Sequence, residues 1–302
     1  MNKILWCCNT QKGFDVLKKI ISFRPEVIGL VCSYGDKKVV VDYGKKIRNL
    51  CKERDISFIH WSEFRSSPEE YIAEYNLTGI VAIGWQYLIP IQLNELLVDK
   101  IIVFHDSLLP RFRGFSPLPT AIIKGCTKTG VSVIYASSGM DEGNIILQSS
   151  MRIDKDEYIA DSIKKMSSLY VELSKKLIIQ LENNSISSTS QEGSPTYSVW
   201  RDKLDCEIKW GASSTDIHNL VRAVGNPYPG AYMFFNDEKV LINRTTIMED
   251  IDFEVRDAGK FWKVEEGMPV VICGTGLIRI DEAVFAKTKS KFTTNLLRGR
   301  FS

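Results

Sequence analysis

The sequence predicts an α/β fold, a doubly wound and mostly parallel sheet, followed by a small C-terminal β-barrel domain. Two observations support this prediction. Before residue 184, short apolar runs rich in β-branched residues alternate with amphipathic segments of helical period, as in successive βαβ units. After Thr196, short strand-like runs follow one another between turn residues, which is typical of antiparallel sheets. The chain is therefore expected to fold as two domains.

The first domain is expected to contain short apolar strands, of which those at 80–83 and 101–104 should be fully buried. The strands lie at residues 3–8, 27–31, 56–59, 80–83 and 101–104. The last two runs are short and apolar, as strands covered on both faces should be. Apolar residues at helical spacing predict helices at 14–21 and 43–50, and a long helix at 159–181. Strands and helices thus alternate, which favours parallel pairing with helical crossovers.

The expected boundaries follow changes in composition. The first domain spans 1–184, because the long helix stops at Asn183-Asn184. Residues 185–196 are rich in Ser, Thr and Gly and predict a linker. The barrel domain then spans 197–302, with one helix at 214–224. Its expected strands lie at 206–210, 231–235, 239–243, 261–264, 270–273 and 277–280. The basic tail at 287–300 is expected to be a solvated end.

Composition argues against several classes of protein. The 302 residues are 44% hydrophobic and 25% charged, and the net charge of +2 does not suggest bulk attraction to nucleic acid or an anionic membrane. We find neither a membrane-length apolar run nor a signal-peptide pattern, so a cytoplasmic protein is expected. The seven cysteines are odd in number and lack a C-x-x-C pair, which favours reduced, mostly buried thiols. No clustered ligands suggest a metal site.

The stretch from Phe104 to Gly114 is the most informative part of the chain. It begins where a buried strand ends, and ligands of open α/β sheets bind beyond the carboxyl ends of strands. A histidine there, His105, could exchange a proton near neutral pH. The other histidines are His60, without a surrounding polar motif, and His218, within the expected helix of the barrel domain. Position alone leaves two interpretations of His105 open, a functional residue and a structural one.

Two further stretches carry candidate functional residues. Gly139 and Gly143 bracket Asp141 on a tight loop before a strand, where a carboxylate could orient an imidazole. A simple turn-forming aspartate is the alternative. The loop from Gly84 to Pro90 follows the strand at 80–83 and is rich in aromatic residues. Such a loop can hold a flat ring, or it can simply cover the core.

Together these stretches resemble the formyltransferases that use 10-formyltetrahydrofolate. That family includes methionyl-tRNA formyltransferase, glycinamide ribonucleotide formyltransferase and the sugar-nucleotide N-formyltransferases. The resemblance rests on H-x-S-L-L-P followed by Arg113-Gly114, and on D-x-G-x-I beginning at Asp141. Stretches of the barrel domain at 208–210, 217–219 and 226–231 match as well. The resemblance to this family covers nearly the whole chain.

The resemblance implies a role for each candidate residue. His105 and Asp141 would be catalytic, with Asp141 holding the required tautomer of His105 while an amine attacks the formyl carbon. The 10-formyltetrahydrofolate co-substrate would contact Gln86, Tyr87, Leu88, Ile89 and Ser107. The acceptor would contact Asn9, Thr10, Trp200 and Arg201. The reaction would need no metal.

One position departs from the family pattern. The family places an asparagine two residues before the histidine, and this chain has Val103. That asparagine donates to the formyl oxygen as charge develops on it, and losing one such donor typically costs about 10² to 10³ in rate. Either another donor serves, such as a backbone N–H or Ser107, or activity is reduced. A folate- or nucleotide-binding protein with little catalysis is therefore one alternative.

The expected acceptor is the amine of a nucleotide-linked amino sugar, of the kind used in lipopolysaccharide O-antigen biosynthesis. Methionyl-tRNA is the alternative. The tRNA enzymes carry a basic loop after the second strand, and the corresponding segment at 33–41 is reduced in basic residues. Trp200 could stack on a base and Arg201 could pair with a phosphate, or the two could simply pack the domain junction. A homodimer is a further possibility left open.

Overall fold

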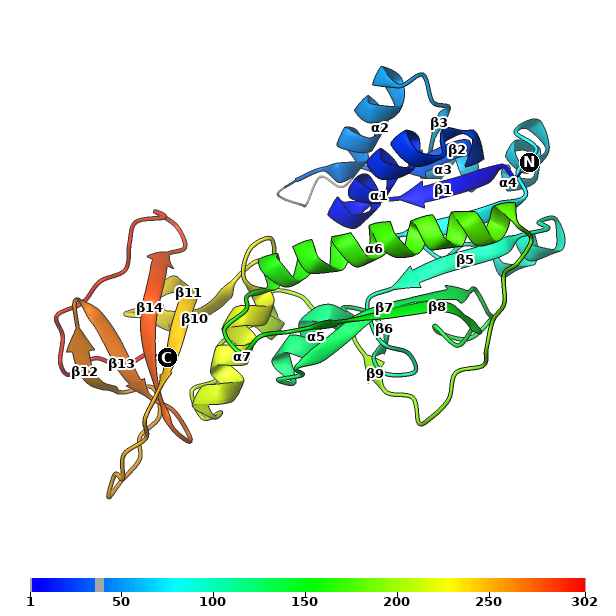
Figure 1. Cartoon of the computed structure of the whole chain (residues 1–302). Coiled ribbons are helices and arrows are strands. Elements are labelled where there is room, and N and C mark those ends of the chain that lie inside the picture. The colour runs from blue at the N-terminus through cyan, green and yellow to red at the C-terminus, as the bar shows by residue number, and fades with distance from the viewer. Residues whose placement is uncertain (1, 36–40, 302) are drawn as a thin grey trace. The chain divides into compact units, whose positions relative to one another are not determined.

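The computed structural model describes residues 2–35 and 41–301 (Figure 1). Contacts divide the chain into two compact units. The first comprises Met1–Pro117, Lys128–Met151 and Ile163–Ser198, and the second comprises Leu118–Thr127, Arg152–Ser162 and Val199–Ser302. Each unit has a large sheet of its own. In the described ranges, every helix is too short or too polar to cross a membrane.

The first unit is built on a seven-stranded sheet. Its strands are β1 (Ile4–Cys8), β2 (Ile28–Ser33), β3 (Phe58–His60), β4 (Gly79–Ile83), β5 (Lys100–His105), β7 (Lys128–Tyr135) and β8 (Ile145–Arg152). They lie in the order β3-β2-β1-β4-β5-β7-β8. The first five are parallel, whereas β5 and β7 run antiparallel. The doubly wound, mostly parallel sheet is confirmed, and the antiparallel strand β7 is an addition to the predicted strands.

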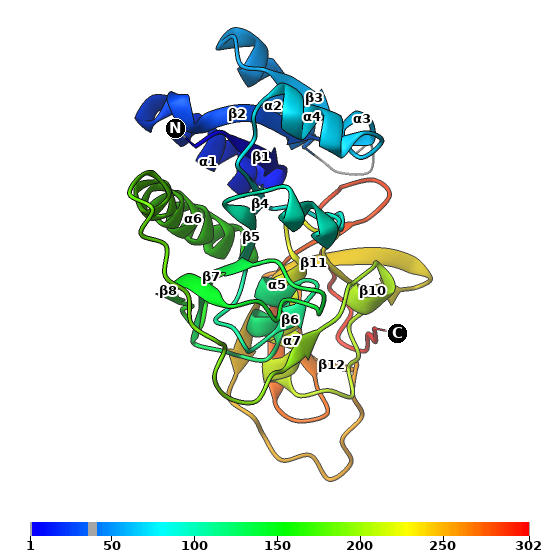
Figure 2. The same ribbon diagram turned by 90° about the vertical axis from the view of Figure 1, so that its right-hand side faces the viewer.

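Helices cover both faces of this sheet (Figure 2). They are α1 (Thr10–Phe23), α2 (Tyr43–Glu53), α3 (Trp61–Phe64), α4 (Pro68–Glu74) and α6 (Ile159–Glu182), with 3₁₀ turns η1 (Pro25–Val27) and η2 (Ile91–Glu95). Alternate residues of β5 meet different layers, because side chains of a strand point to opposite faces. The ring centroids of Phe104 and Tyr170 on α6 lie 5.2 Å apart. Val103, on the other face, packs against the core cluster that includes Trp61 of α3. The long amphipathic helix predicted at 159–181 is confirmed.

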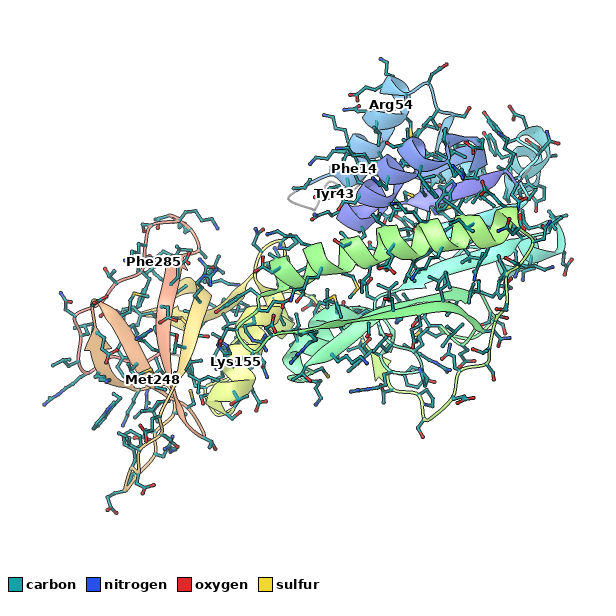
Figure 3. The ribbon with its side chains drawn as sticks, in the orientation of Figure 1. Phe14, Tyr43, Arg54, Lys155, Met248 and Phe285 are labelled. Carbon is teal, nitrogen blue, oxygen red and sulfur yellow. The ribbon has the colours of Figure 1, made fainter. Side chains whose placement is uncertain are left out.

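Helices α1 and α2 are neighbours on the sheet. Figure 3 labels Phe14 of α1 and Tyr43 of α2, whose ring centroids lie 6.1 Å apart. The cysteines of the sheet, Cys7, Cys8 and Cys32, are packed into the core. All seven cysteines are free thiols, and every one except Cys126 is buried. Burial raises the pKa of the Cys51 thiol to about 12, so this thiol stays protonated and unreactive at neutral pH.

The strand order reverses at β1, which has β2 on one side and β4 on the other. The turns that follow β1 and β4 touch here. Asn9 donates its backbone N–H to the Ile83 carbonyl (3.1 Å). Gly84 has φ +58°, and a Cβ at that position would lie 2.2 Å from the Thr10 hydroxyl oxygen, so only glycine fits. Thr10 itself has φ +60°, which is unusual for a β-branched residue. Ligands of open α/β sheets bind at such a reversal point.

The second unit contains a five-stranded antiparallel sheet (yellow to red in Figure 1). Its elements are α5 (Pro117–Ile123), η3 (Leu204–Cys206), α7 (Ser214–Val224), β10 (Ala231–Phe235), β11 (Glu238–Met248), β12 (Phe261–Glu265), β13 (Met268–Ile272) and β14 (Leu277–Phe285). The sheet order is β10-β11-β14-β13-β12. The strand predicted at 206–210 is wrong. There the chain forms η3 and a single bridge from Glu207 to Tyr232, because the preceding residues close a turn.

Aromatic side chains form part of the core of this unit. Phe301 lies 4.6 Å from Phe261 and 5.4 Å from Trp210, measured between ring centroids. Phe292 also contacts Phe301 and is buried. The basic tail was expected to be a solvated end. Its charged side chains do face solvent, but Phe292 within the tail and Phe301 directly after it are buried in the core.

His218 of α7 is buried in the second unit. Its Nδ1 lies 2.8 Å from the hydroxyl oxygen of Thr245. Burial lowers the pKa of His218 below its usual value, and the neighbouring Arg222 guanidinium lowers it further. Asp156 and Asp281 act in the opposite direction without restoring the ordinary pKa. The folded protein therefore holds His218 neutral.

We expect His218 to make stability depend on pH. The unfolded chain binds a proton at this histidine near pH 6.5, whereas the folded chain resists protonation, so the free energy of unfolding should decrease as the pH falls below about 6.5. In His218→Gln, the free energy of unfolding should depend less steeply on pH, and the change in slope should correspond to at most one bound proton. Urea denaturation at several pH values between 7.5 and 5.5 measures the free energy of unfolding, with His60→Gln as the control. Parallel curves for wild type and His218→Gln would contradict the argument.

Candidate active site

His105 is the last residue of β5 and is only 7% exposed. Its Nε2 lies 2.8 Å from the backbone carbonyl oxygen of Phe112, seven residues later. A carbonyl oxygen can only accept a hydrogen bond, so Nε2 carries a proton. The other ring nitrogen, Nδ1, lies 3.5 Å from Oδ2 of Asp141, which is the separation of an ion pair rather than a close hydrogen bond. The two residues singled out from the sequence are therefore neighbours.

Asp141 lies in the loop between β7 and β8. Its φ of +52° is in the left-handed region, and its Oδ2 accepts a hydrogen bond from the backbone N–H of Gly114 (2.8 Å). Gly143 must be glycine, because a Cβ there would lie 1.7 Å from the Tyr135 carbonyl oxygen. The loop thus holds the carboxylate in one place. The expectation that Asp141 selects the tautomer of His105 needs correction, because the Phe112 carbonyl performs that task.

The residue after His105 anchors the turn. Asp106 forms an ion pair with Lys12 of α1 and accepts a hydrogen bond from the hydroxyl of Tyr170 on α6. Burial alone would raise the pKa of Asp106, but the Lys12 ammonium and the Tyr170 hydroxyl outweigh it, and the pKa lies below its usual value. The same burial, together with the Asp106 carboxylate, raises the pKa of Tyr170. The carboxylate therefore stays charged and fixes the start of the turn.

Ser107 has a structural role in the same turn. Its hydroxyl donates to the Arg111 carbonyl (2.6 Å), and its own carbonyl accepts from the hydroxyl of Ser132 (2.7 Å). Gln148 in turn donates to the Ser132 hydroxyl (2.8 Å). Because the single proton of the Ser107 hydroxyl is committed, it is not free to donate to a formyl oxygen. The suggestion that Ser107 replaces the donor missing at Val103 is therefore not supported.

Val103 lies two residues before His105 and is partly buried against the core cluster that includes Trp61. Residues two apart on a strand share a face, so Val103 and His105 point to the same side of the sheet. An asparagine here would place an amide beside the imidazole. Valine offers only methyl groups. The departure from the family pattern is thus located at the His105–Asp141 pair.

The loop that follows β4 rests on an aromatic cluster. Tyr87 packs against Tyr34 (4.7 Å between centroids) and Trp61 (6.0 Å), and Trp85 contacts all three rings. Tyr87 is nevertheless 47% exposed and Leu88 is 94% exposed, and Gln86 is exposed as well. Ile89 turns back onto the core. The loop therefore presents open apolar and aromatic surface on a rigid base.

The residues expected to contact the acceptor fall into two groups. Asn9 and Thr10 follow β1, and the Asn9 side chain accepts a hydrogen bond from the Ser33 hydroxyl (3.3 Å). Trp200 and Arg201 belong to the second unit, where Trp200 is 65% exposed. Most of the reduced basic loop, residues 36–40, lies outside the described residues.

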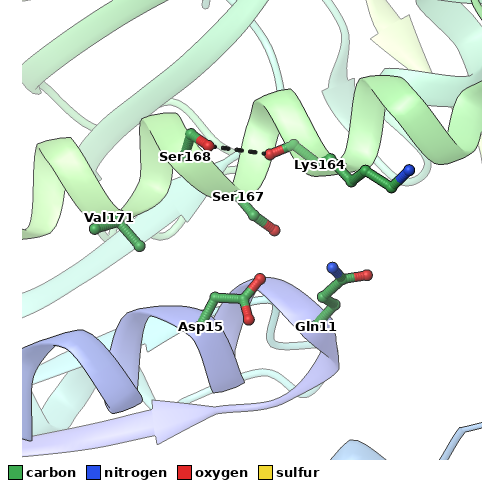
Figure 4. Close-up of a pocket in the computed structure, with 6 residues that line it drawn as sticks. All are labelled: Gln11, Asp15, Lys164, Ser167, Ser168 and Val171. Atoms are coloured by element: carbon green, nitrogen blue, oxygen red, sulfur yellow. Dashed lines mark hydrogen bonds between the residues drawn. The ribbon is translucent and has the colours of Figure 1, made fainter.

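A cavity of about 380 Å³ lies between α1 and α6 (Figure 4). It is lined by Gln11, Asp15, Lys164, Ser167, Ser168 and Val171. Burial raises the pKa of Asp15 in its wall. None of the expected site residues lines this cavity, so it does not mark the reacting centre. Within residues 2–35 and 41–301, no group of three potential metal ligands gathers.

Comparison with known proteins agrees with the fold and the sequence motifs. A formyl transferase family model matches residues 12–179, and a model of the formyl transferase C-terminal domain matches 201–300. Methionyl-tRNA formyltransferase of Acetivibrio thermocellus is 28% identical over 95% of this chain and 93% of its own.

Two solved structures are similar in fold. WlaRD, a sugar 3-N-formyltransferase crystallised with dTDP and 5-N-formyl-THF, aligns over 98% of this chain and 99% of its own with a TM-score of 0.69 and 19% identity. Methionyl-tRNA formyltransferase from Clostridium thermocellum aligns over 82% of this chain and 94% of its own length, with a TM-score of 0.59 and 19% identity. The family models cover both parts of the chain, and this protein therefore belongs to the formyltransferases, enzymes that transfer a formyl group.

Proposed function

We propose that this protein transfers a formyl group from 10-formyltetrahydrofolate to the amine of a nucleotide-linked amino sugar. The observation that carries the chemistry is the His105–Asp141 pair in a formyltransferase fold, with His105 buried at the carboxyl end of β5 and Asp141 partly buried beside it. The pair combines a proton acceptor with a fixed negative charge. That combination suits an acyl transfer in which an amine loses a proton as it attacks.

The proton inventory of the pair suggests how the transfer proceeds. Because Nε2 of His105 is protonated, Nδ1 of the neutral ring holds the lone pair and can accept a proton from the attacking amine. The ring is then a cation 3.5 Å from the Asp141 carboxylate, while Nε2–H remains on the Phe112 carbonyl. The new C–N bond forms, the bond from the formyl carbon to N10 breaks, and N10 takes the proton from His105. Tetrahydrofolate and the formylated amine leave.

The oxyanion of the tetrahedral intermediate needs a positive partner. With Val103 in place of an asparagine, and with the Ser107 hydroxyl committed, we assign this task to the protonated His105. The assignment makes His105 both the proton acceptor and the charge that stabilises the intermediate. It also explains how the site can function without the amide at position 103.

The aromatic loop is proposed to hold the pteridine ring of the co-substrate. Tyr87 lies half exposed on Tyr34 and Trp61, so its ring is held from below and open above. A flat heterocycle can stack on such a ring. The fold neighbour crystallised with 5-N-formyl-THF supports a folate donor for this chain.

Two observations bear on the acceptor. The sugar N-formyltransferase aligns over more of this chain, and with a higher TM-score, than the methionyl-tRNA formyltransferase structure. The modest net charge of +2 also favours a small nucleotide over tRNA. The second candidate is methionyl-tRNA, favoured by the Acetivibrio thermocellus relative that matches nearly the full length. A panel containing both acceptors distinguishes the two.

For the acceptor, we expect the best nucleotide-linked amino sugar to be formylated with a kcat/KM at least about a hundredfold above that for methionyl-tRNA. The reason is that a net charge of +2 gives little overall attraction to the many phosphates of a tRNA. Formyl transfer from 10-formyltetrahydrofolate is followed for each acceptor by mass spectrometry. Efficient formylation of the tRNA, with the sugars untouched, would favour the second candidate. Failure of every acceptor would instead favour a binding protein.

For the reacting centre, His105→Ala and Asp141→Asn should each lower kcat by at least about 10². The double variant should lose little more than the worse single variant, because the two residues act as one unit. Single-turnover formyl transfer with the identified acceptor measures this, and His60→Gln serves as the control. A wild-type rate in His105→Ala would refute the assigned centre.

For the donor pocket, Tyr87→Ala should raise the KM for 10-formyltetrahydrofolate by about tenfold, since one stacking contact is lost. The KM for the acceptor should stay within a factor of about two. Tyr75→Ala is the control, because Tyr75 packs against the same core cluster but lies outside the loop. An effect confined to the acceptor KM would place the loop on the other substrate.

A further inference from the structure

The segment between α6 and the second unit contacts Asp141 and the hydrogen-bond partner of His105, Phe112. Its composition suggested a linker, yet it is bonded to the first unit along its length. Thr189 exchanges both backbone hydrogen bonds with Ile145 (2.8 and 2.9 Å). The short strand β9 (Tyr197–Ser198) pairs in parallel with β6 (Arg113–Gly114). We refer to residues 189–198 as the brace.

One side chain of the brace holds the Asp141 loop. The Gln191 amide nitrogen donates to the carbonyl oxygens of Asp141 (2.7 Å) and Gly143 (2.9 Å). Its amide oxygen accepts from Nε and Nη2 of Arg113 (3.1 and 2.8 Å). Arg113 also pairs with Glu142 of the same loop (3.1 Å). The arginine donors settle which end of the amide faces which partner, because guanidinium nitrogens cannot accept.

The other end of the brace holds the partner of His105. The hydroxyl of Thr196 accepts from the backbone N–H of Phe112 (2.9 Å), and its carbonyl accepts from the N–H of Arg113 (2.9 Å). Phe112 supplies the carbonyl that receives Nε2–H of His105. The brace therefore contacts the supports of both members of the pair.

We propose that Gln191 is a positioning residue, which holds the left-handed Asp141 loop so that its carboxylate lies beside His105. The inference rests on the proposed function of that pair and adds a residue between the two stretches matched by the family models, 12–179 and 201–300. A left-handed aspartate relaxes toward other conformations unless its surroundings hold it. Two hydrogen bonds to the carbonyls that flank this loop supply that restraint.

An amide is the only side chain of this size that satisfies both sides at once. Glutamate at 191 would keep the two acceptors for Arg113 but would face the two carbonyls without a proton to donate. Alanine would remove all four hydrogen bonds. Gln191→Glu therefore tests the loop contacts with little change in shape, and Gln191→Ala tests the whole arrangement. Glu192→Ala, an exposed neighbour on the brace, is the matched control.

The first measurement is independent of catalysis. The Gly114 N–H is bonded to the Asp141 carboxylate, so its hydrogen exchange reports whether that carboxylate is in place. Exchange of this amide should accelerate at least about tenfold in both Gln191 variants. Amides of the central strand β1 should be unchanged, as should Gly114 in Glu192→Ala. Unaltered exchange at Gly114 in Gln191→Ala would overturn the proposal.

The second measurement is a double-mutant cycle with Asp141→Asn in single-turnover formyl transfer. Each Gln191 variant should lower kcat at least about tenfold while the donor KM stays within about threefold. In the Asp141→Asn background the same changes should cost almost nothing, because Gln191 acts through Asp141. Losses that multiply would indicate a general structural role and overturn the proposal. A wild-type rate in Asp141→Asn alone refutes the proposed function and, with it, this catalytic role. This outcome is measured on the single variant Asp141→Asn, so failure of the proposed function is distinguished from failure of the Gln191 proposal.

Discussion

A partly buried carboxylate links three elements of the first unit. Asp106 leaves the end of β5 and meets the ammonium of Lys12 on α1 and the hydroxyl of Tyr170 on α6. Removing either Lys12 or the Asp106 carboxylate would leave the other charge unpaired and partly buried, which is more costly than losing an exposed ion pair. One side chain thus ties a strand end to two helices. Because His105 is the adjacent residue, these contacts of Asp106 also hold the backbone that carries the imidazole.

The proposed reacting pair, His105 and Asp141, is held mainly through the backbone. His105 is oriented by the carbonyl of Phe112, and Asp141 by the N–H of Gly114. Backbone groups in a tight turn move less than long side chains, so they preorganise a site with little entropy left to lose. The glycines beside the pair allow the close approach that such contacts require. The geometry of this centre therefore depends on backbone conformation as much as on the identity of its two titratable residues.

Sequence patterns revealed those features that burial and local propensity control. The strands at 80–83 and 101–104 were predicted because their residues are apolar on both sides, and His105 was noticed because it ends one of them. Strand β7 was missed, since Gly130 and Ser132 interrupt its apolar run. A carbonyl acceptor such as that of Phe112 leaves no trace in side-chain composition. Gln191 lies among Ser, Thr and Gly, whose local signal is that of a loop, and its partners are distant in the sequence.

The brace also affects the order in which the molecule is completed. A ribosome releases the chain from its N-terminus, so both sequence motifs, every strand of the large sheet and the long helix emerge before residues 189–198. Until then, Phe112 lacks Thr196 and the loop of Asp141 lacks Gln191. A nascent chain that ends with α6 therefore contains the residues of the centre without the arrangement that defines it. The proposed centre is therefore complete only after the last ten residues of the first unit, 189–198, have been synthesised.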